Sequence, residues 1–208
     1  MIRASRPVLA ALFAGLLAVA IGASEPVVPV AAPNPVDLPV PAFRQQADNW
    51  CWLAAAEMVV YYKKWGLSPK QCEILEAGIG APNGACCADP ARCDRPGSLA
   101  EIRRVIAHFG GAASALVPAL RPEALYRTLQ AGHVVVAALQ HPAGGPGHVV
   151  VIKGLRFQVR WLPPRTDGGP PVQLIEPWVS INDPRGIITE SLPYANLAPY
   201  WVSSVIVE

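Results

Sequence analysis

The sequence lacks several features that would place it in a particular class of protein. Charged residues make up only 15% of the 208 residues, and the 17 basic residues nearly balance the 15 acidic ones. No basic run is longer than a pair such as Lys63-Lys64, so we expect no nucleic-acid partner. After Ile21 there is no second long apolar run, and there is no internal repeat.

The first 23 residues have the layout of a secretory signal peptide. Arg3 and Arg6 precede an almost uncharged run from Val8 to Ala23, and the first acidic residue is Glu25. This run is shorter than the roughly 18 residues that a membrane-spanning helix needs. We therefore expect residues 1–23 to be removed. The remaining protein should then have no membrane attachment and be secreted or periplasmic. An uncleaved N-terminal anchor is the alternative.

The rest of the chain divides into a short linker and one domain. Residues 24–36 are rich in proline and predict an extended tether or a wrapping arm. Residues 37–208 have the size of a single domain that can bury its own core.

Within this domain a helical half precedes a strand-rich half. Helices are predicted over 53–65, 69–77, 98–109 and 122–131, and β-branched runs predict strands over 134–139, 149–152, 172–175, 180–182, 187–191 and 202–207. Residues 156–171 predict a long hairpin excursion that borders the site. The order indicates an α+β domain with a cleft where the two halves meet.

The five cysteines divide into one and four. Cys51 stands 21 residues before Cys72, whereas Cys72, Cys86, Cys87 and Cys93 lie close together. In an exported chain four should form disulfides, which leaves Cys51 free. Adjacent cysteines bond poorly, so two pairings remain: 72–86 with 87–93, or 72–87 with 86–93. A zinc site is the weaker alternative because the segment has no histidine and no Cys-x-x-Cys. We expect no metal and no cofactor.

Cys51 occupies a favourable position for a reactive thiol. It lies at or just before the first turn of the first predicted helix, where the peptide dipoles and free N–H groups favour the thiolate. The backbone N–H of Cys51 and the side-chain amide of Gln45, six residues upstream, could together stabilise an oxyanion. The alternative is a buried structural cysteine between core tryptophans.

A base for this thiol is expected at His148. This residue ends the glycine-rich stretch Gly144–Gly147 and opens a strand, where the backbone allows close approach and holds the imidazole firmly. His133 and His141 lack this context.

A third group is expected at the end of a later strand to orient the imidazole. Asn182 and Asp183 both compete for this role, and their side chains should point to opposite faces of the strand. The alternative is that the sequence Asn182-Asp183-Pro184 only makes a turn.

These segments resemble the papain-like cysteine peptidases. The resemblance is carried by Gln45, residues 49–55, residues 147–151 and residues 182–184, and the cysteines between 72 and 93 resemble those of exported bacterial members. It is greatest for the small bacterial branch that includes secreted avirulence effector proteases and more distant for bacteriocin leader peptidases. It implies a papain-like fold, in which the helical half packs on an antiparallel sheet.

The resemblance also implies the role of each site residue. Cys51 is the nucleophile, His148 the base and then the acid, Asp183 the orienting group and Gln45 the oxyanion donor. Gln46 remains open for the glutamine role, and Asn182 for the orienting role.

The predicted activity is cleavage of peptide bonds in a protein or peptide substrate through an acyl-enzyme thioester. We expect Trp50, Trp52 and Gly147 to contact this substrate. Acyl transfer to an amine by the same triad and a catalytically silent peptide-binding module are the alternatives. The sequence carries no signal for the oligomeric state.

Overall fold

The computed structural model describes residues 31–64, 67–79, 84–164, 166, 171–188 and 190–208. The predicted signal peptide, residues 1–23, lies outside this range. In chain order the elements are β1 (Val36–Asp37), α1 (Cys51–Lys63), α2 (Gln71–Ile79), α3 (Ala85–Ala88), a 3-10 turn η1 (Pro90–Cys93), α4 (Leu99–His108), α5 (Pro122–Gln130), β2 (Val134–Leu139), β3 (His148–Leu162), β4 (Val172–Asn182), β5 (Ser191–Pro193), α6 (Tyr194–Leu197) and β6 (Trp201–Val207).

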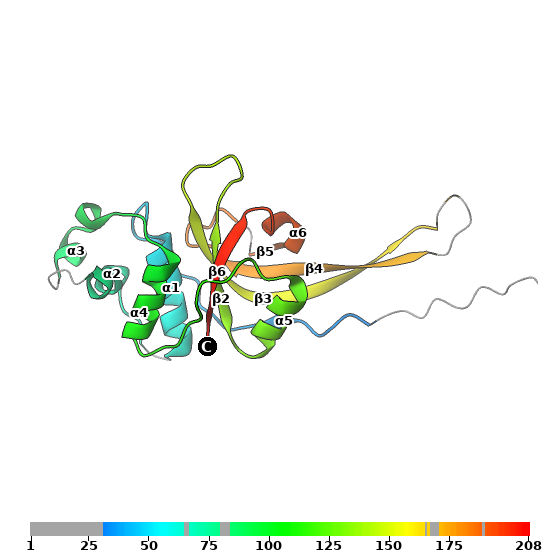
Figure 1. The fold of residues 1–208 in the computed structure, drawn as a ribbon, viewed down its shortest axis with the longest axis horizontal. Coiled ribbons are helices and arrows are strands. Elements are labelled where there is room, and N and C mark those ends of the chain that lie inside the picture. Colours follow the sequence, from blue (N-terminus) through cyan, green and yellow to red (C-terminus); the bar gives the residue numbers. More distant parts are fainter. Residues whose placement is uncertain (1–30, 65–66, 80–83, 165, 167–170, 189) are drawn as a thin grey trace, which may run out of the picture.

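The strands of the described residues form one antiparallel sheet in the order β5-β4-β3-β2-β6, with β1 paired to β3 (Figure 1). Helices α1, α2 and α4 come between β1 and β2 in the chain and lie to one side of the sheet (Figure 1). The predicted α+β class, with a helical N-terminal half packed on an antiparallel C-terminal sheet, is confirmed.

Both faces of the sheet are covered by helices. Val134 and Val136 of β2 belong to the core shared with α1, α2 and α4, whereas Val135 and Ala137 pack in a second core that contains Leu125 and Leu129 of α5. A strand that is buried on both faces needs apolar residues at every position. This explains why the predicted strand over 134–139 is a continuous apolar run, and its bounds are confirmed.

Helix α1 is the central helix of the first core. Every residue from Cys51 to Val60 is buried, so its hydrophobicity extends round the whole helix. It starts at Cys51 itself, two residues before the predicted start. Helix α4 starts at the predicted position, with Ser98 and Glu101 forming both bonds of a capping box.

Residues 172–175 and 180–182 are strand residues, as predicted, but they belong to one continuous strand, β4. The strand predicted over 187–191 was wrong for Ile187, Ile188 and Glu190, which lie outside any strand. The backbone N–H groups of Ile187 and Ile188 donate to the side chain of Asp183 instead of to a neighbouring strand.

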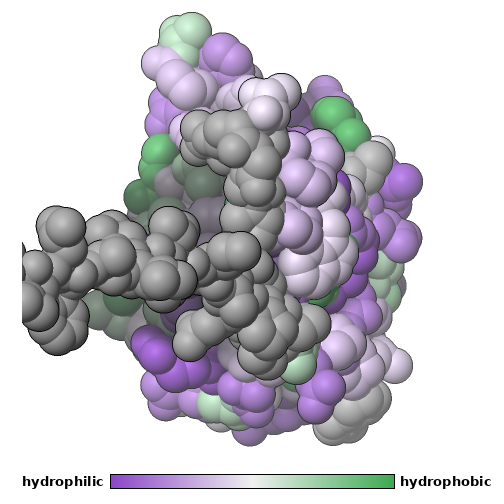
Figure 2. Space-filling model, turned by 90° about the vertical axis from the view of Figure 1, so that its right-hand side faces the viewer, coloured by the Kyte–Doolittle hydropathy of each residue, from purple (hydrophilic) through white to green (hydrophobic). Residues whose placement is uncertain are grey.

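The predicted hairpin excursion is formed by the distal parts of β3 and β4, which pair from Leu155 with Val179 to Leu162 with Val172. It projects away from the body of the molecule (Figure 1). From this end, hydrophilic residues dominate the surface that is drawn in colour (Figure 2). Residues 156–164 do not line the clefts that contain Cys51 or His148, so the expectation that the hairpin borders the site is wrong.

The described end of the proline-rich segment is a wrapping arm. The carbonyl oxygen of Asn34 accepts a hydrogen bond from the hydroxyl of Tyr126, and Val36 pairs with Leu155 of β3. Val36 therefore belongs to the sheet.

Candidate active site

Among the described residues, Cys51 is the cysteine with a free thiol, and it lies at the start of the central helix. Cys51 is the first residue of α1, and only 7% of its surface is exposed. The first N–H groups of a helix have no partner inside the helix. No acceptor in the described part of the chain takes the N–H of Cys51, so this donor points out of the helix end.

A buried polar network holds the loop that leads to Cys51. The amide of Gln71 donates to the Glu57 carboxylate and to the Arg44 carbonyl oxygen, both at 2.8 Å, and its oxygen accepts the N–H of Gln46 at 2.9 Å. Burial raises the pKa of the Glu57 carboxyl, an effect that the hydrogen bond from Gln71 opposes. The sequence analysis did not find this network, although a charged residue inside the apolar α1 segment was a signal for it.

Two tryptophans connect residues 49–52, which include Cys51, to residues 93–97. Trp50 and Trp52 are 0% and 1% exposed, and their indole N–H groups donate to the carbonyl oxygens of Cys93 and Arg95. The prediction that these tryptophans contact the substrate is therefore wrong. Gly97 leaves room for the Trp52 ring, because a Cβ atom at this position would lie 2.2 Å from it.

Asn49 and Asp94 form a second connection between the same two segments. The backbone N–H of Asn49 donates to one oxygen of the Asp94 carboxylate at 2.9 Å, and its side-chain amide donates to the other at 3.1 Å. Residues 93–97 therefore hold the loop immediately before Cys51 through both backbone and side-chain groups.

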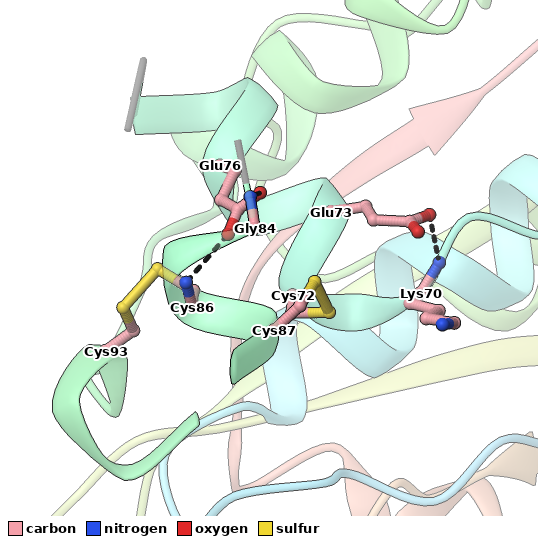
Figure 3. Close-up of a disulfide and its surroundings, with 8 residues drawn as sticks. All are labelled: Lys70, Cys72, Glu73, Glu76, Gly84, Cys86, Cys87 and Cys93. Atoms are coloured by element: carbon pink, nitrogen blue, oxygen red, sulfur yellow. Dashed lines mark hydrogen bonds between the residues drawn. A yellow bond between two sulfur atoms is a disulfide. The ribbon is translucent and has the colours of Figure 1, made fainter. Parts of the chain in front are cut away.

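Disulfides cross-link the region that includes this segment (Figure 3). The bonds are Cys72–Cys87 and Cys86–Cys93, which is the second of the two pairings that the sequence left open. Glu76 of α2 adds a further connection, because its carboxylate accepts the N–H of Cys86. The Cys86–Cys93 disulfide is linked to residues 49–52 through Cys93, because the carbonyl oxygen of Cys93 accepts the Trp50 indole N–H.

The base expected from sequence lies next to one of its two possible partners. His148 is the first residue of β3, and its Nε2 is 2.5 Å from Oδ1 of Asp183. Asn182 points elsewhere, and its amide donates to the carbonyl oxygens of Val40 and Pro41 at 3.0 Å. The opposite directions of the two side chains, expected for consecutive residues of a strand, leave Asp183 as the partner of His148.

Backbone donors surround the Asp183 carboxylate. The N–H of Arg185 donates to Oδ1, and those of Ile187 and Ile188 donate to Oδ2 at 2.8 and 2.7 Å. The side chain of Asp183 is 1% exposed. Burial raises the pKa of this carboxyl, but the bond to His148 and the backbone donors outweigh it and hold the pKa well below its usual range.

The thiol and the imidazole influence each other. Burial raises the pKa of Cys51, but the hydrogen bond and charge of His148, with smaller effects of the Val149 N–H and of Arg185, lower it overall from 9.0. Burial lowers the pKa of His148, whereas its bonds to Asp183 and Cys51 raise it to about 9. Both shifts favour a thiolate beside an imidazolium.

The two nitrogens of the His148 ring have different surroundings. Nε2 contacts Asp183, whereas Nδ1 is buried and makes no hydrogen bond among the described residues. Nδ1 is therefore the nitrogen available to the Cys51 thiol.

The two glutamines considered for the oxyanion role have different positions. The amide nitrogen of Gln45 donates to the carbonyl oxygens of Ala47 and Asp48 at 2.8 and 2.7 Å, so both of its hydrogens are engaged. Gln45 can donate to an oxyanion only if it gives up one of these two hydrogen bonds. The side chain of Gln46 is exposed, and it is the backbone of this residue that joins the Gln71 network.

A cleft of about 500 Å³ contains the thiol and the imidazole. Its lining includes Cys51, His148, Gly97, Gly147 and Arg185. Contact of Gly147 with substrate stays a prediction. Arg185 was missed because it comes two residues after Asp183 in a segment without a recognisable motif.

No metal centre competes with this arrangement in the described residues, where no group of three or more His, Cys, Asp or Glu side chains could hold an ion. The zinc alternative is wrong, because the four clustered cysteines form disulfides. None of the described helices is long and apolar enough to cross a membrane.

Comparison with known proteins identifies the family. Residues 37–184 match the model of the Peptidase_C39 like family. The chain belongs to this family. The match includes all the residues from Cys51 to Asp183, and no protein of curated function matches the sequence.

Solved structures were compared with the fold of this chain. A crystal structure described as that of a C39-like peptidase from Bacillus anthracis has a TM-score of 0.52 and 14% identity, covering 85% of this chain and 98% of that chain. A structure of UfSP from C. elegans has a TM-score of 0.44 and 14% identity, covering 89% of this chain and 35% of that chain. The fold is that of the papain-like cysteine peptidases.

Proposed function

We propose that the protein is an exported thiol peptidase that cleaves peptide bonds through Cys51, His148 and Asp183. The observation that carries the proposal is that the helix-start thiol and the imidazole line one cleft, and that the imidazole contacts a buried carboxylate. Membership of the Peptidase_C39 like family supports the same activity.

The proposed reaction begins with attack of the Cys51 thiolate on the carbonyl carbon of the substrate. The carbonyl oxygen becomes an oxyanion, which accepts a hydrogen bond from the free N–H of Cys51. It also accepts one from the Gln45 amide, once that amide gives up its hydrogen bond to Ala47 or Asp48. The C–N bond then breaks, and the His148 imidazolium gives its proton to the leaving amine. Water, deprotonated by His148, attacks the thioester and releases the acid and the thiolate.

Asp183 acts in this proposal by holding the imidazole. Its contact with Nε2 directs Nδ1 to the thiol, and its negative charge stabilises the imidazolium that accompanies the thiolate. The backbone donors of Arg185, Ile187 and Ile188 keep the carboxylate ionised and fixed.

We further propose that the protein acts in an oxidising compartment, either secreted or periplasmic. Two disulfides in a chain of this size are typical of such compartments. The proposed cleavage of residues 1–23 is tested by the N-terminal sequence of the exported protein, which we expect to begin near Ser24. Membership of the avirulence effector branch remains a prediction.

The direct test is the purified, oxidised protein acting on an unfolded protein substrate without added reductant. We expect Cys51→Ala to abolish cleavage and His148→Ala to lower kcat/KM by at least about 10³-fold, because each removes a group that reacts. His133→Ala is the matched control, since His133 lines neither cleft beside His148, and it should retain activity. Unchanged turnover by the Cys51 variant would refute the proposal.

A thiol-reactive epoxide provides a second readout that is independent of the substrate. We expect stoichiometric labelling of Cys51 that is lost in His148→Ala, because the imidazolium stabilises the thiolate. The absence of labelling in the wild-type protein would instead favour a silent peptide-binding module. Product analysis with an added amine separates hydrolysis from acyl transfer.

A further inference from the structure

The cleft that contains Cys51 continues past His148 into a second cavity. The first has a volume of about 500 Å³ and the second about 590 Å³. Leu139, Gln140, Pro146, His148 and Arg185 line both, so the two cavities meet beside the imidazole. Cys51 lines only the first of them.

The proposed chemistry assigns a different half of the substrate to each cavity. The acyl half becomes bonded to Cys51, whereas the other half leaves as an amine after it receives a proton from His148. A cavity that reaches His148 but not Cys51 therefore lies on the side of the leaving amine.

The walls of the second cavity are suited to an apolar side chain. Ile187, Ile188, Leu192, Leu197 and Tyr200 all line it, and no acidic residue does. The side chain of Ile187 is largely uncovered, with 75% of its surface exposed, and Tyr200 is 39% exposed. A concave apolar surface of this kind recognises a ligand mainly by removing apolar area from water.

This wall is fixed relative to the imidazole. The N–H groups of Ile187 and Ile188 donate to Oδ2 of Asp183, while Oδ1 of the same carboxylate contacts His148. One carboxylate thus positions both the proton donor and the surface beside it.

We propose that the second cavity, lined by Ile187, Ile188, Leu192, Leu197 and Tyr200, is the subsite for a large apolar side chain on the residue that supplies the leaving amine. The proposal rests on the proposed peptidase function and adds a substrate class to it: peptides in which the cleaved bond precedes a residue such as leucine or phenylalanine. Differences of a few methylene groups in an apolar pocket change kcat/KM by about 10- to 100-fold.

The test uses peptides built on a cleavage site that is first mapped in an unfolded protein with the oxidised full-length enzyme. The peptides differ only in the residue after the cleaved bond, which is leucine, phenylalanine, serine or aspartate. We expect kcat/KM to be about 10- to 100-fold higher for leucine or phenylalanine than for serine, and lowest for aspartate.

Two matched variants connect this preference to the cavity. Ile187→Gln changes the second cavity, whereas Val202→Gln changes an exposed apolar residue, 53% exposed, that lines only the cavity with Cys51. We expect Ile187→Gln to lower the leucine-to-serine ratio of kcat/KM by about tenfold, and Val202→Gln to leave it unchanged. Because the measured quantity is a ratio, a general loss of catalytic rate in either variant does not affect it.

The possible failures are distinguishable. Equal cleavage of all four peptides, or an unchanged ratio in Ile187→Gln, would overturn the subsite and leave the peptidase standing. If no cleavage site can be mapped and Cys51 does not react with the epoxide, both proposals fall.

Discussion

The two sides of the cleft hold their reactive groups by different means. On the helical side, Cys51 is positioned by segments distant in the chain, with residues 93–97 contacting Asn49, Trp50 and Trp52. On the sheet side, His148 is the first residue of β3 and Asp183 directly follows β4, the strand paired with it.

This difference shows how each side depends on its surroundings. The helical side is secured by cross-links and long-range hydrogen bonds, so a change far from Cys51 can move it. The sheet side is secured by strand pairing and by three backbone donors to one carboxylate, so its geometry depends chiefly on Asp183 itself. The first two of the following predictions each alter one side, and the last alters a residue that touches both.

The largest effect is expected on the sheet side, from Asp183→Asn. Loss of the charge should lower kcat/KM by about 10²- to 10⁴-fold, because the imidazole loses its orienting partner and the imidazolium its stabilisation. Wild-type activity should rise with pH as Cys51 ionises, below the ordinary thiol pKa of 9.0, and fall as His148 loses its proton near pH 9. In the variant the pKa of His148 falls, so the alkaline limb should move to lower pH.

Asn182→Ser is the control for this experiment. It removes two hydrogen bonds to the carbonyl oxygens of Val40 and Pro41, so it should lower the midpoint of urea denaturation but leave the pH profile in place. A loss of activity in Asn182→Ser equal to that in Asp183→Asn would contradict the assignment.

A smaller effect is expected on the helical side, from removal of the Cys86–Cys93 bond in the double variant Cys86→Ser with Cys93→Ser. The free energy of unfolding should fall by about 2–4 kcal/mol. Activity should also fall, by about 10- to 100-fold. The Cys93 carbonyl oxygen accepts the indole N–H of Trp50, next to Cys51, and a shift of about 1 Å in a reacting group is costly.

The double variant Cys72→Ser with Cys87→Ser is the matched control. It removes the other disulfide, whose cysteines make no hydrogen bond to Asn49, Trp50 or Trp52. Urea denaturation should show a similar loss of stability, but kcat/KM of the protein that remains folded should change much less. Equal losses of kcat/KM in the two double variants would show that residues 93–97 do not position Cys51 more than the rest of the cross-linked region does.

Local sequence patterns were sufficient for the features that depend on neighbouring residues. The helix start near Ser98, the apolar strand at Val134 and the isolation of Cys51 all have local signals. Strand geometry indicated that only one of Asn182 and Asp183 can face His148. The resemblance to papain-like peptidases then supplied roles that no local pattern carries.

The features that sequence reasoning missed depend on distant partners. Trp50 and Trp52 were assigned to the substrate because their acceptors lie 43 residues away, on Cys93 and Arg95. The β-branched residues at 187 and 188 were read as a strand, but the side chain of Asp183 takes their N–H groups.

The smallest effect is expected from Arg185→Gln, which changes a group that touches both sides. Its guanidinium donates to the Asp48 carbonyl oxygen and lines the cleft, and its charge helps to lower the pKa of Cys51. The variant should move the acid limb of the pH profile upward by less than about one unit, because the exposed charge is screened by solvent.

The alkaline limb provides the internal reference for this variant. Its position depends on His148, whose pKa is raised by Asp183 and Cys51, and the backbone N–H that Arg185 donates to Asp183 is retained in the glutamine variant. Arg160→Gln removes an equal charge from the exposed hairpin and should move neither limb. If Arg185→Gln shifted both limbs equally, the guanidinium would be acting on the whole triad, and the two sides of the cleft could not be tuned separately.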